Sequence, residues 1–412
     1  EIRLSLVGSE MCIRDRYMRY ADKMNYVKKS AIRSVMADAS ENGTVDYISF
    51  ASGFPDPEAI PQEKLEEVGH KILQEKTYEV LQYGSAQGYT GLIESSKSFI
   101  NKHECICTSN DDIIITTGSQ QGLDLVSKIF CDEGDYVVVE NPSYLGALNS
   151  FKCNGAKLLG VSLEEDGVNL EELEEAFKKG PKVFYTIPNF QNPTGVTTSL
   201  EKRKEIYNLA VKYDVVILED NPYGYLRITG EEVPSIKSLD QDHRVVYAAS
   251  LSKIISPGMR TGIICASKDI ISKLFMAKQS GDNHTNNLSQ YMMDAFLRET
   301  DMDAHIKHLQ SLYAKKCNFM LEMIKKYFHP SIHVIEPEGG MFIWFDLPEG
   351  VSMPEFVQAS IKKHVAIVPG NEFMVDSTKP CQSIRMNFSA ASMENIEKGI
   401  QILGELTYKF CK

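Results

Sequence analysis

The chain has 412 residues, of which 43% are hydrophobic and 24% charged, and its formal net charge is −12. This composition is typical of a globular protein, and the length is enough for one large core and a smaller domain. The acidic balance argues against nucleic acid or an anionic membrane as the main partner, and no apolar run reaches the roughly 18 residues of a membrane span. Nine cysteines without a C-x-x-C pair favour free thiols in a reducing compartment, so we expect a cytoplasmic protein.

The first 17 residues contain the string EIRLSLVGSEMCIRDR, which lacks the layout of a signal peptide. The string resembles a translated sequencing adapter, and we therefore expect residues 1–17 to be a non-native or disordered leader. The natural start is predicted at Met18, and residues 18–49 are expected to contribute to a small domain.

Short β-branched stretches alternate with helical stretches between residues 112 and 249. This alternation predicts strands joined by helices in parallel crossovers, and the continuous Val and Ile runs predict strands buried on both faces. We therefore expect one large α/β domain over residues 50–300. The predicted strands are 112–116, 136–140, 157–161, 182–187, 215–219 and 245–249, and the helices between the first five are 118–130, 144–153, 170–179 and 200–213.

The pattern changes at about residue 302, where a long helical stretch begins and continues to residue 327. Short strands at 332–336, 341–346 and 383–387 and a closing helix at 393–408 predict a smaller α+β domain over residues 301–412. In open α/β sheets ligands bind at the carboxyl ends of the strands. The functional residues are therefore expected in the loops that follow the predicted strands.

The loop after strand 245–249 contains Ser250, Ser252 and Lys253, and Arg260 comes seven residues after the lysine. A lysine near cationic or desolvating groups has a lowered pKa and can form a Schiff base. The arginine and the serines are suited to holding a phosphate. The alternative, a surface lysine after a strand, is the usual fate of a lone lysine.

The loops after strands 215–219 and 182–187 contain further candidates. Asp220 and Tyr223 follow the first of these strands, and Asn192 follows the second. Because a carboxylate leaving a buried strand is costly unless it is paired, we interpret Asp220 as the partner of a protonated ring nitrogen. Tyr223 and Asn192 would donate hydrogen bonds to a ring oxygen. Turn-forming sequence alone is the alternative for both loops.

Gly118, Ser119 and Gln120 follow strand 112–116 and open a predicted helix. The N–H groups at a helix start can bind a phosphate, although a helix capped by serine has the same sequence. Tyr144 could stack on an aromatic ring, and the Tyr83 hydroxyl could reach a phosphate. Taken alone, both tyrosines are ordinary core or surface aromatics.

Arg385 lies on an otherwise apolar predicted strand and requires a carboxylate partner, such as that of an amino-acid substrate. An internal salt bridge is the alternative. Arg33 is a weaker candidate for a second carboxylate contact, with a solvated helix face as the alternative. We predict no metal site, because motifs such as H-E-x-x-H do not occur.

These candidates match the groups that bind pyridoxal 5′-phosphate (PLP). The aldehyde of PLP reacts with a lysine, and its pyridine nitrogen pairs with a carboxylate. Its phenolate oxygen accepts hydrogen bonds, and its phosphate is bound by N–H groups, hydroxyls and a cation. The sequence therefore predicts PLP as the cofactor, with Lys253, Asp220 and Tyr223 as the catalytic residues.

The same ordered set resembles the class I/II, fold-type I PLP-dependent aminotransferases over nearly all of residues 18–412. The segments NYVKKSAIR and ISFASGFPDPEAIP are most similar to the 2-aminoadipate and kynurenine aminotransferase subgroup. The sequence departs from that subgroup at Ser52-Gly53, where a Gly-Gly pair is usual. Gly53 remains available for a backbone contact with substrate.

The resemblance implies a large domain with a mainly parallel seven-stranded sheet and a small domain built from both chain ends. It also implies a homodimer with shared active sites, in which Tyr83 reaches the neighbouring subunit's phosphate. Arg385 would bind the substrate α-carboxylate, and Arg33 would lie near the substrate.

The implied activity moves an amino group from an L-amino acid to a 2-oxo acid such as 2-oxoglutarate, with Lys253 as general base and acid. Aromatic, 2-aminoadipate-like and branched aliphatic donors all fit the sequence. Two alternatives stay open: another PLP-dependent reaction such as a C–S or β-lyase, and a PLP-binding regulatory module without turnover.

Overall fold

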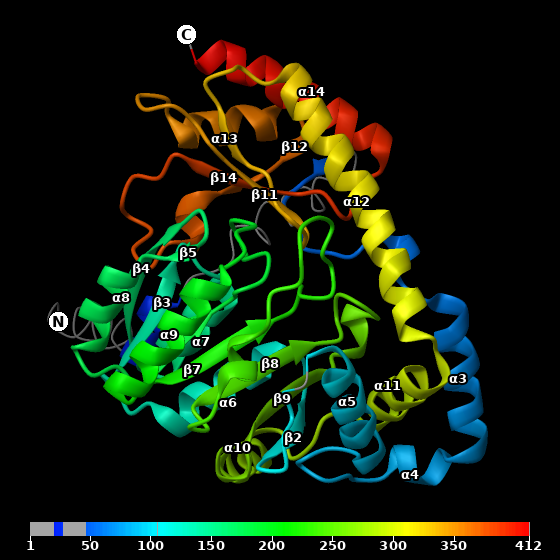
Figure 1. The fold of residues 1–412 in the computed structure, drawn as a ribbon. Helices are drawn as coiled ribbons and strands as arrows, with labels where there is room; N and C mark the ends of the chain where they lie inside the picture. Colours follow the sequence, from blue (N-terminus) through cyan, green and yellow to red (C-terminus); the bar gives the residue numbers. More distant parts are fainter. Residues whose placement is uncertain (1–19, 28–46, 105, 412) are drawn as a thin grey trace, which may run out of the picture.

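The computed structural model describes residues 20–27, 47–104 and 106–411. The described residues form one mixed eight-stranded sheet with the order β2-β9-β8-β7-β6-β3-β4-β5 (Figure 1). Its strands are β2 (Asp111–Thr116), β3 (Tyr136–Asn141), β4 (Lys157–Glu164), β5 (Gly167–Val168), β6 (Val183–Thr186), β7 (Val216–Asn221), β8 (Val245–Ser250) and β9 (Gly262–Ser267).

The sheet is mainly parallel, as predicted. Strands β4, β3, β6, β7 and β8 pair in parallel in that spatial order, whereas β9 runs antiparallel to both β2 and β8. Within the described chain, seven of the strands match the expected seven-stranded sheet, and β5 adds an eighth of two residues that pairs antiparallel with β4.

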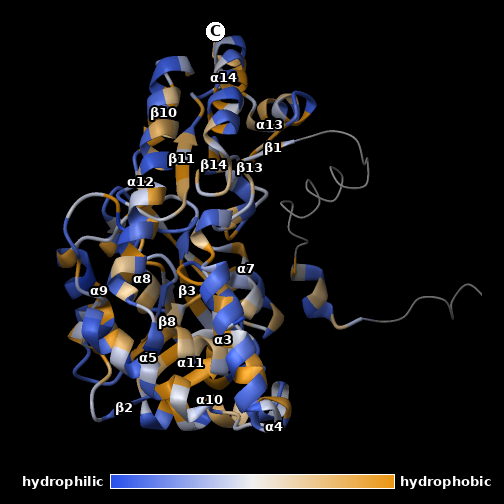
Figure 2. Ribbon diagram, turned by 90° about the vertical axis from the view of Figure 1, so that its right-hand side faces the viewer, coloured by the Kyte–Doolittle hydropathy of each residue, from blue (hydrophilic) through white to orange (hydrophobic). Residues whose placement is uncertain are grey.

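Helices cover both faces of the sheet because its strands are apolar on both sides. Val138 on β3 packs with Leu173 of α8 (Leu170–Phe177) and Ile206 of α9 (Leu200–Tyr213) in one core cluster. Its neighbours Val137 and Val139 belong to a second cluster, with residues of α6 (Ser119–Phe130) and α7 (Leu145–Cys153). Successive side chains of a strand point to opposite faces, so these two helix pairs cover opposite sides of the sheet. In Figure 2 the buried strands are largely orange, whereas the outer helices carry both colours.

A four-stranded antiparallel sheet, β10-β11-β14-β13, lies toward the C-terminal end of the chain. Figure 1 shows α12 running from the region of the large sheet toward this second sheet, with α14 beside its upper part. Strand β1 pairs in parallel with β12, so a segment near the N-terminus joins the C-terminal part of the fold. The strands are β1 (Ile48–Ser49), β10 (His333–Ile335), β11 (Phe342–Asp346), β12 (Val365–Ala366), β13 (Val368–Pro369) and β14 (Ser383–Asn387).

The helices that the sequence predicted are present with ends shifted by at most a few residues, and several others were not predicted. Helices α3, α4, α5, α10, α11 and α13 fall in the second group. The helices are α3 (Gln62–Glu75), α4 (Thr77–Leu81), α5 (Thr90–His103), α6 (Ser119–Phe130), α7 (Leu145–Cys153), α8 (Leu170–Phe177), α9 (Leu200–Tyr213), α10 (Lys268–Gly281), α11 (Asn287–Glu299), α12 (Met302–Tyr327), α13 (Met353–Lys362) and α14 (Met393–Phe410). Of the helices in the described part of the chain, none is both long and apolar enough to cross a membrane.

Candidate active site

A cavity of about 260 Å³ lies at the carboxyl ends of β6, β7 and β8. Most of the residues predicted from the sequence line it, although they come from segments far apart in the chain. The predicted residues in its lining are Gly53, Ser119, Gln120, Tyr144, Asn192, Asp220, Tyr223, Ser250, Ser252, Lys253, Arg260 and Arg385. The fold therefore brings the separate strand-end loops together in one place.

Lys253 lies in the turn that follows β8, and its side chain points into the cavity. Its Nζ donates a hydrogen bond to the backbone carbonyl oxygen of Gly53 at 2.7 Å. Burial, together with the positive charges of Arg385 and Arg260, lowers the pKa of Lys253 to about 8. About a tenth of the amine is therefore neutral at pH 7, and a neutral amine is the form that attacks a carbonyl carbon.

Asp220 lies at the carboxyl end of β7, and only 3% of it is exposed. Its Oδ2 accepts a hydrogen bond from the hydroxyl of Tyr185 at 2.8 Å. Its Oδ1 is buried and has no hydrogen-bond partner among the described residues. Burial is the main cause that raises the pKa of Asp220, and with the opposing hydrogen bond from Tyr185 and the added charge of Glu140 the pKa is about 7. The unsatisfied oxygen requires a donor, and a cationic N–H group suits it best.

Arg385 lies on β14 and is held on several sides. Its Nη1 donates to Oδ1 of Asn192 at 2.9 Å, and its Nη2 donates to the carbonyl oxygen of Ala51 at 2.6 Å. The guanidinium also lies over the ring of Phe342 at 4.3 Å and the ring of Phe373 at 4.8 Å. Burial lowers the pKa of Arg385 to about 10, so the group stays cationic at neutral pH.

Arg385 has no acidic partner within the described residues. Its Nε is buried there without a hydrogen-bond acceptor. A buried cation in this state favours an anionic ligand, and the internal salt bridge considered from the sequence is not present among these residues.

Tyr223 and Asn192 approach the cavity from neighbouring strand ends. Burial raises the pKa of the Tyr223 hydroxyl, and a hydrogen bond with Asn192 opposes that rise. The Tyr223 ring meets Phe342 edge to face, with the ring centres 5.8 Å apart. The hydroxyl therefore stays protonated at neutral pH and can act as a hydrogen-bond donor toward the cavity.

Gly118, Ser119 and Gln120 form the start of α6 beside Arg260. Gly118 has a φ of 74°, and a Cβ added to it would lie 2.3 Å from Nη2 of Arg260. Only glycine lets the backbone turn here and approach the guanidinium so closely. Arg260 makes no ion pair with a described carboxylate, so its charge and the N–H groups at the helix start form an anion-binding corner.

Two predicted residues that the structure describes, Gly118 and Tyr83, are absent from the lining of this cavity. Tyr83 follows α4 and is 81% exposed, with its ring packed edge to face on His284 at 5.8 Å. It faces solvent in the single chain and stays a predicted contact to a second subunit. Arg33 and residues 1–17, which were predicted to be a leader, lie outside the described residues.

Tyr185 and Phe342 are two residues at the site that the sequence analysis missed. Both lie inside apolar strands, β6 and β11, where a tyrosine or phenylalanine is ordinary core composition. Alternation along β6 offers one usable signal, because Tyr185 lies two residues before Ile187, which lines the cavity, and therefore on the same face of the chain.

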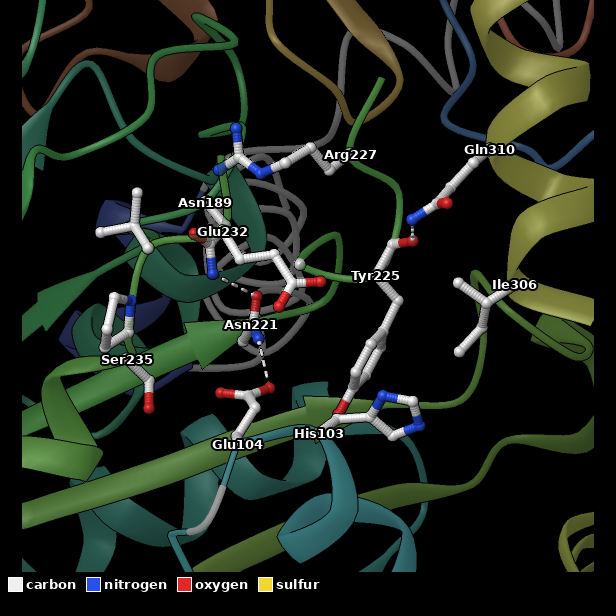
Figure 3. Close-up of a pocket in the computed structure, with 13 residues that line it drawn as sticks. His103, Glu104, Asn189, Asn221, Tyr225, Arg227, Glu232, Ser235, Ile306 and Gln310 are labelled. Atoms are coloured by element: carbon white, nitrogen blue, oxygen red, sulfur yellow. Dashed lines mark hydrogen bonds between the residues drawn. The ribbon is translucent and has the colours of Figure 1, made fainter. Parts of the chain in front are cut away.

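A second cavity, of about 350 Å³, lies close by and is centred on Asn221, the residue after Asp220 (Figure 3). Nδ2 of Asn221 donates to Oε1 of Glu104 at 3.2 Å and to the hydroxyl of Tyr247 at 2.7 Å, and Tyr247 also donates to Glu104. Nδ2 of Asn189 donates to Oδ1 of Asn221 at 3.0 Å. The lining contains no lysine, and its hydrogen bonds fix the end of β7 that carries Asp220.

The fold is an α/β sheet, and its site combines a partly neutral lysine with a group of anion-binding residues. These features together indicate a transferase. Residues 45–403 match the family described as aminotransferase class I and II, and the chain belongs to that family. It is 38% identical to aromatic-amino-acid aminotransferase 1 of Thermococcus litoralis, over 94% of this chain and 93% of that protein.

Solved structures of similar proteins agree with this family. A kynurenine aminotransferase of Pyrococcus horikoshii, in complex with PMP, KYN and KYA, has a TM-score of 0.91 and 34% identity, covering 98% of this chain and all of that one. An alpha-aminoadipate aminotransferase of Thermus thermophilus, complexed with N-(5′-phosphopyridoxyl)-L-leucine, has a TM-score of 0.86 and 32% identity, covering 95% of this chain and 98% of that one. The chain is thus a fold-type I aminotransferase, and its cofactor is PLP.

The groups that line the cavity match the chemical groups of PLP. The unsatisfied Oδ1 of Asp220 suits a protonated pyridine nitrogen, the Lys253 amine suits an aldehyde, and the corner formed by Ser119 and Arg260 suits a phosphate. The described residues contain no cluster of three or more His, Cys, Asp or Glu side chains that could hold a metal ion.

Proposed function

We propose that this aminotransferase takes the amino group of an aromatic, 2-aminoadipate-like or branched aliphatic L-amino acid and passes it to a 2-oxo acid such as 2-oxoglutarate. The observation that carries the site assignment is the lowered pKa of Lys253, about 8, in a cavity that also holds Asp220 and Arg385. The names of the relatives support the donor range, since they include aromatic amino-acid, kynurenine and alpha-aminoadipate aminotransferases.

In this proposal Arg385 binds the substrate α-carboxylate with a guanidinium that already lies between Asn192, Ala51 and two aromatic rings. That fixed position orients the substrate Cα toward Lys253. Nζ of Lys253 then removes the Cα proton and later returns it as general acid. Bound PLP supplies a protonated pyridine ring that accepts the electron density released at Cα.

Asp220 keeps that ring protonated through its unpaired Oδ1, and Tyr223 with Asn192 donates to the ring oxygen. Gly118, Ser119, Gln120, Ser250, Ser252 and Arg260 hold the phosphate, and Tyr144 stacks on the ring. Gly53, Asn192 and Arg33 contact the substrate.

We also propose a homodimer with shared active sites. Apolar side chains are exposed around the end of α3 and α4, with exposed fractions of 45% for Leu73, 75% for Tyr78 and 70% for Leu81. Tyr83, on the same stretch, would reach the neighbouring subunit's phosphate. The cytoplasmic location, the leader at residues 1–17 and the domain limits 18–49, 50–300 and 301–412 likewise remain proposals.

The test is a screen of L-amino-acid donors with 2-oxoglutarate as acceptor, following glutamate formation by the PLP-loaded enzyme. We expect glutamate from at least one of the three donor classes and none from the Lys253→Ala variant. Pyruvate and ammonia from a single amino acid, without any acceptor, would identify a lyase instead. PLP binding without conversion of any donor would support the regulatory module.

A further inference from the structure

The loop at the start of α6 is held from outside the cavity by two residues at the end of α10. Oδ2 of Asp282 accepts hydrogen bonds from Oγ1 of Thr117 at 3.0 Å and from Nε2 of Gln121 at 2.7 Å. Nζ of Lys278 lies 2.7 and 2.9 Å from the two carboxylate oxygens of Asp282. The two ends of the loop, Thr117 and Gln121, are thus tied to one carboxylate.

The Gln121 amide closes this arrangement. Its Oε1 accepts from the backbone N–H of Thr117 at 2.8 Å and from Nζ of Lys278 at 3.2 Å, while its Nε2 donates to Asp282. Because both ends of the amide are engaged, its orientation is fixed, and Thr117 is held on its backbone and on its side chain. Gly118, with its φ of 74°, lies between these fixed points.

The cluster contains a buried positive charge, that of Lys278 on α10. The Lys278 side chain is fully buried, and 29% of the Asp282 side chain is exposed. Burial lowers the pKa of Lys278, and Asp282 opposes that change by its hydrogen bond and its charge. A buried ion pair is a weak source of stability compared with well-packed apolar side chains. Its benefit here is the fixed geometry of the groups that it touches.

We propose that Asp282 and Lys278 are positioning residues for the cofactor phosphate. They hold Thr117 and Gln121, and through them Gly118 and the N–H groups at the start of α6, in the conformation that accepts an anion beside Arg260. An anion site ordered in advance binds without the entropy cost of ordering its donors. This inference rests on the proposed function, because it takes the start of α6 to be the phosphate site.

The test compares PLP with pyridoxal, which lacks the phosphate, on the dimeric apo-protein. We expect Asp282→Ala to weaken PLP binding about tenfold while pyridoxal binding stays unchanged, because only the phosphate uses the loop. Asp282→Asn should fall between Asp282→Ala and the wild type. The double variant Lys278→Met/Asp282→Ala removes the buried charge together with its partner, so the fold is retained and the selective loss of PLP affinity should persist. Inorganic phosphate should compete with PLP less effectively in these variants.

Asp240→Asn is the matched control. Asp240 pairs at 2.9 Å with Lys237, which is 2% exposed, in a buried cluster that does not line the cavity. This variant should lower stability and leave the ratio of PLP to pyridoxal affinity at its wild-type value. An unchanged ratio in Asp282→Ala, or equal loss for both ligands, would overturn the proposal.

Ser119→Ala and Arg260→Gln separate this proposal from the assignment on which it rests. If they reduce the affinity ratio and Asp282→Ala does not, the positioning role alone is wrong. If neither of them changes the ratio, the phosphate site itself is misassigned, and the positioning role is overturned with it.

Discussion

Lys253 and Gly53, 200 positions apart in the sequence, meet in a hydrogen bond of 2.7 Å between the side-chain amine and the backbone carbonyl oxygen. The contact joins the turn after β8 to the segment after β1, which itself pairs with β12 near the other chain end. The amine is therefore placed by the packing of distant segments, and its ionisation responds to the charges that those segments bring, Arg385 among them.

Arg385→Leu should raise the pKa of Lys253. The guanidinium is the second cause of the lowered value after burial, and removing a positive neighbour favours the protonated amine. We expect the neutral fraction at pH 7 to fall by about a factor of three. The check is the pH dependence of the rate at which apo-protein reacts with PLP or with an amine-specific reagent. Arg244→Leu is the control, because Arg244 pairs with Asp214 outside the cavity. This variant should leave the midpoint of the pH dependence of the rate unchanged.

Asp220→Asn should make the apo-protein more stable at alkaline pH. The folded pKa of this carboxyl is raised from 3.8 to about 7, so the stability contributed by its protonated form is complete below pH 3.8 and is lost as the pH rises to about 7. At pH 8 the substitution should recover up to about 4 kcal/mol, and at pH 4 almost nothing. Urea unfolding at the two pH values measures the difference. PLP affinity should fall in the same variant, and a loss of stability at pH 8 would contradict this account of Asp220.

Asn221→Ala should lower the free energy of unfolding by about 2 kcal/mol, because it removes three hydrogen bonds to buried groups of Glu104, Tyr247 and Asn189. The check is urea unfolding of the apo-protein. Asn208→Ala, at an exposed position of α9, is the matched control and should change stability by less than about 0.5 kcal/mol. Equal effects of the two substitutions would show that the network around Glu104 does not stabilise this end of the sheet.

The large sheet and most of the site could be predicted because the sequence pattern that indicates each strand or loop lies within a few consecutive residues. Buried strands such as 136–140 are continuous β-branched runs, and polar residues directly after them mark strand ends. Strand β9, from Gly262 to Ser267, was not among the strands predicted from the sequence, and its antiparallel direction could not be predicted because the composition of a strand does not depend on its direction. Tyr185 and Phe342 could not be predicted as site residues for a related reason. Their roles depend on contacts with Asp220 and Arg385, and these contacts exist only in the folded chain.

Tyr83 gives the sharpest test of the shared site, because it is 81% exposed and lies outside the cavity of its own chain. Nδ2 of Asn287 donates to the carbonyl oxygen of Gln82 at 2.6 Å, which fixes the backbone just before it. Tyr83→Ala should weaken PLP binding in the dimer and leave the unfolding free energy almost unchanged. Tyr408→Ala, at a tyrosine of α14 that is 55% exposed, controls for the loss of a surface ring.

Mixing Tyr83→Ala subunits with Lys253→Ala subunits should then restore activity that neither variant has alone. In a mixed dimer, the site that keeps Lys253 receives Tyr83 from the other subunit and is complete, whereas the second site lacks both. Random exchange makes half of the dimers mixed, each with one complete site of two, so we expect about a quarter of the wild-type activity. Activity no higher than the sum of the two variants would show that Tyr83 does not serve a neighbouring subunit.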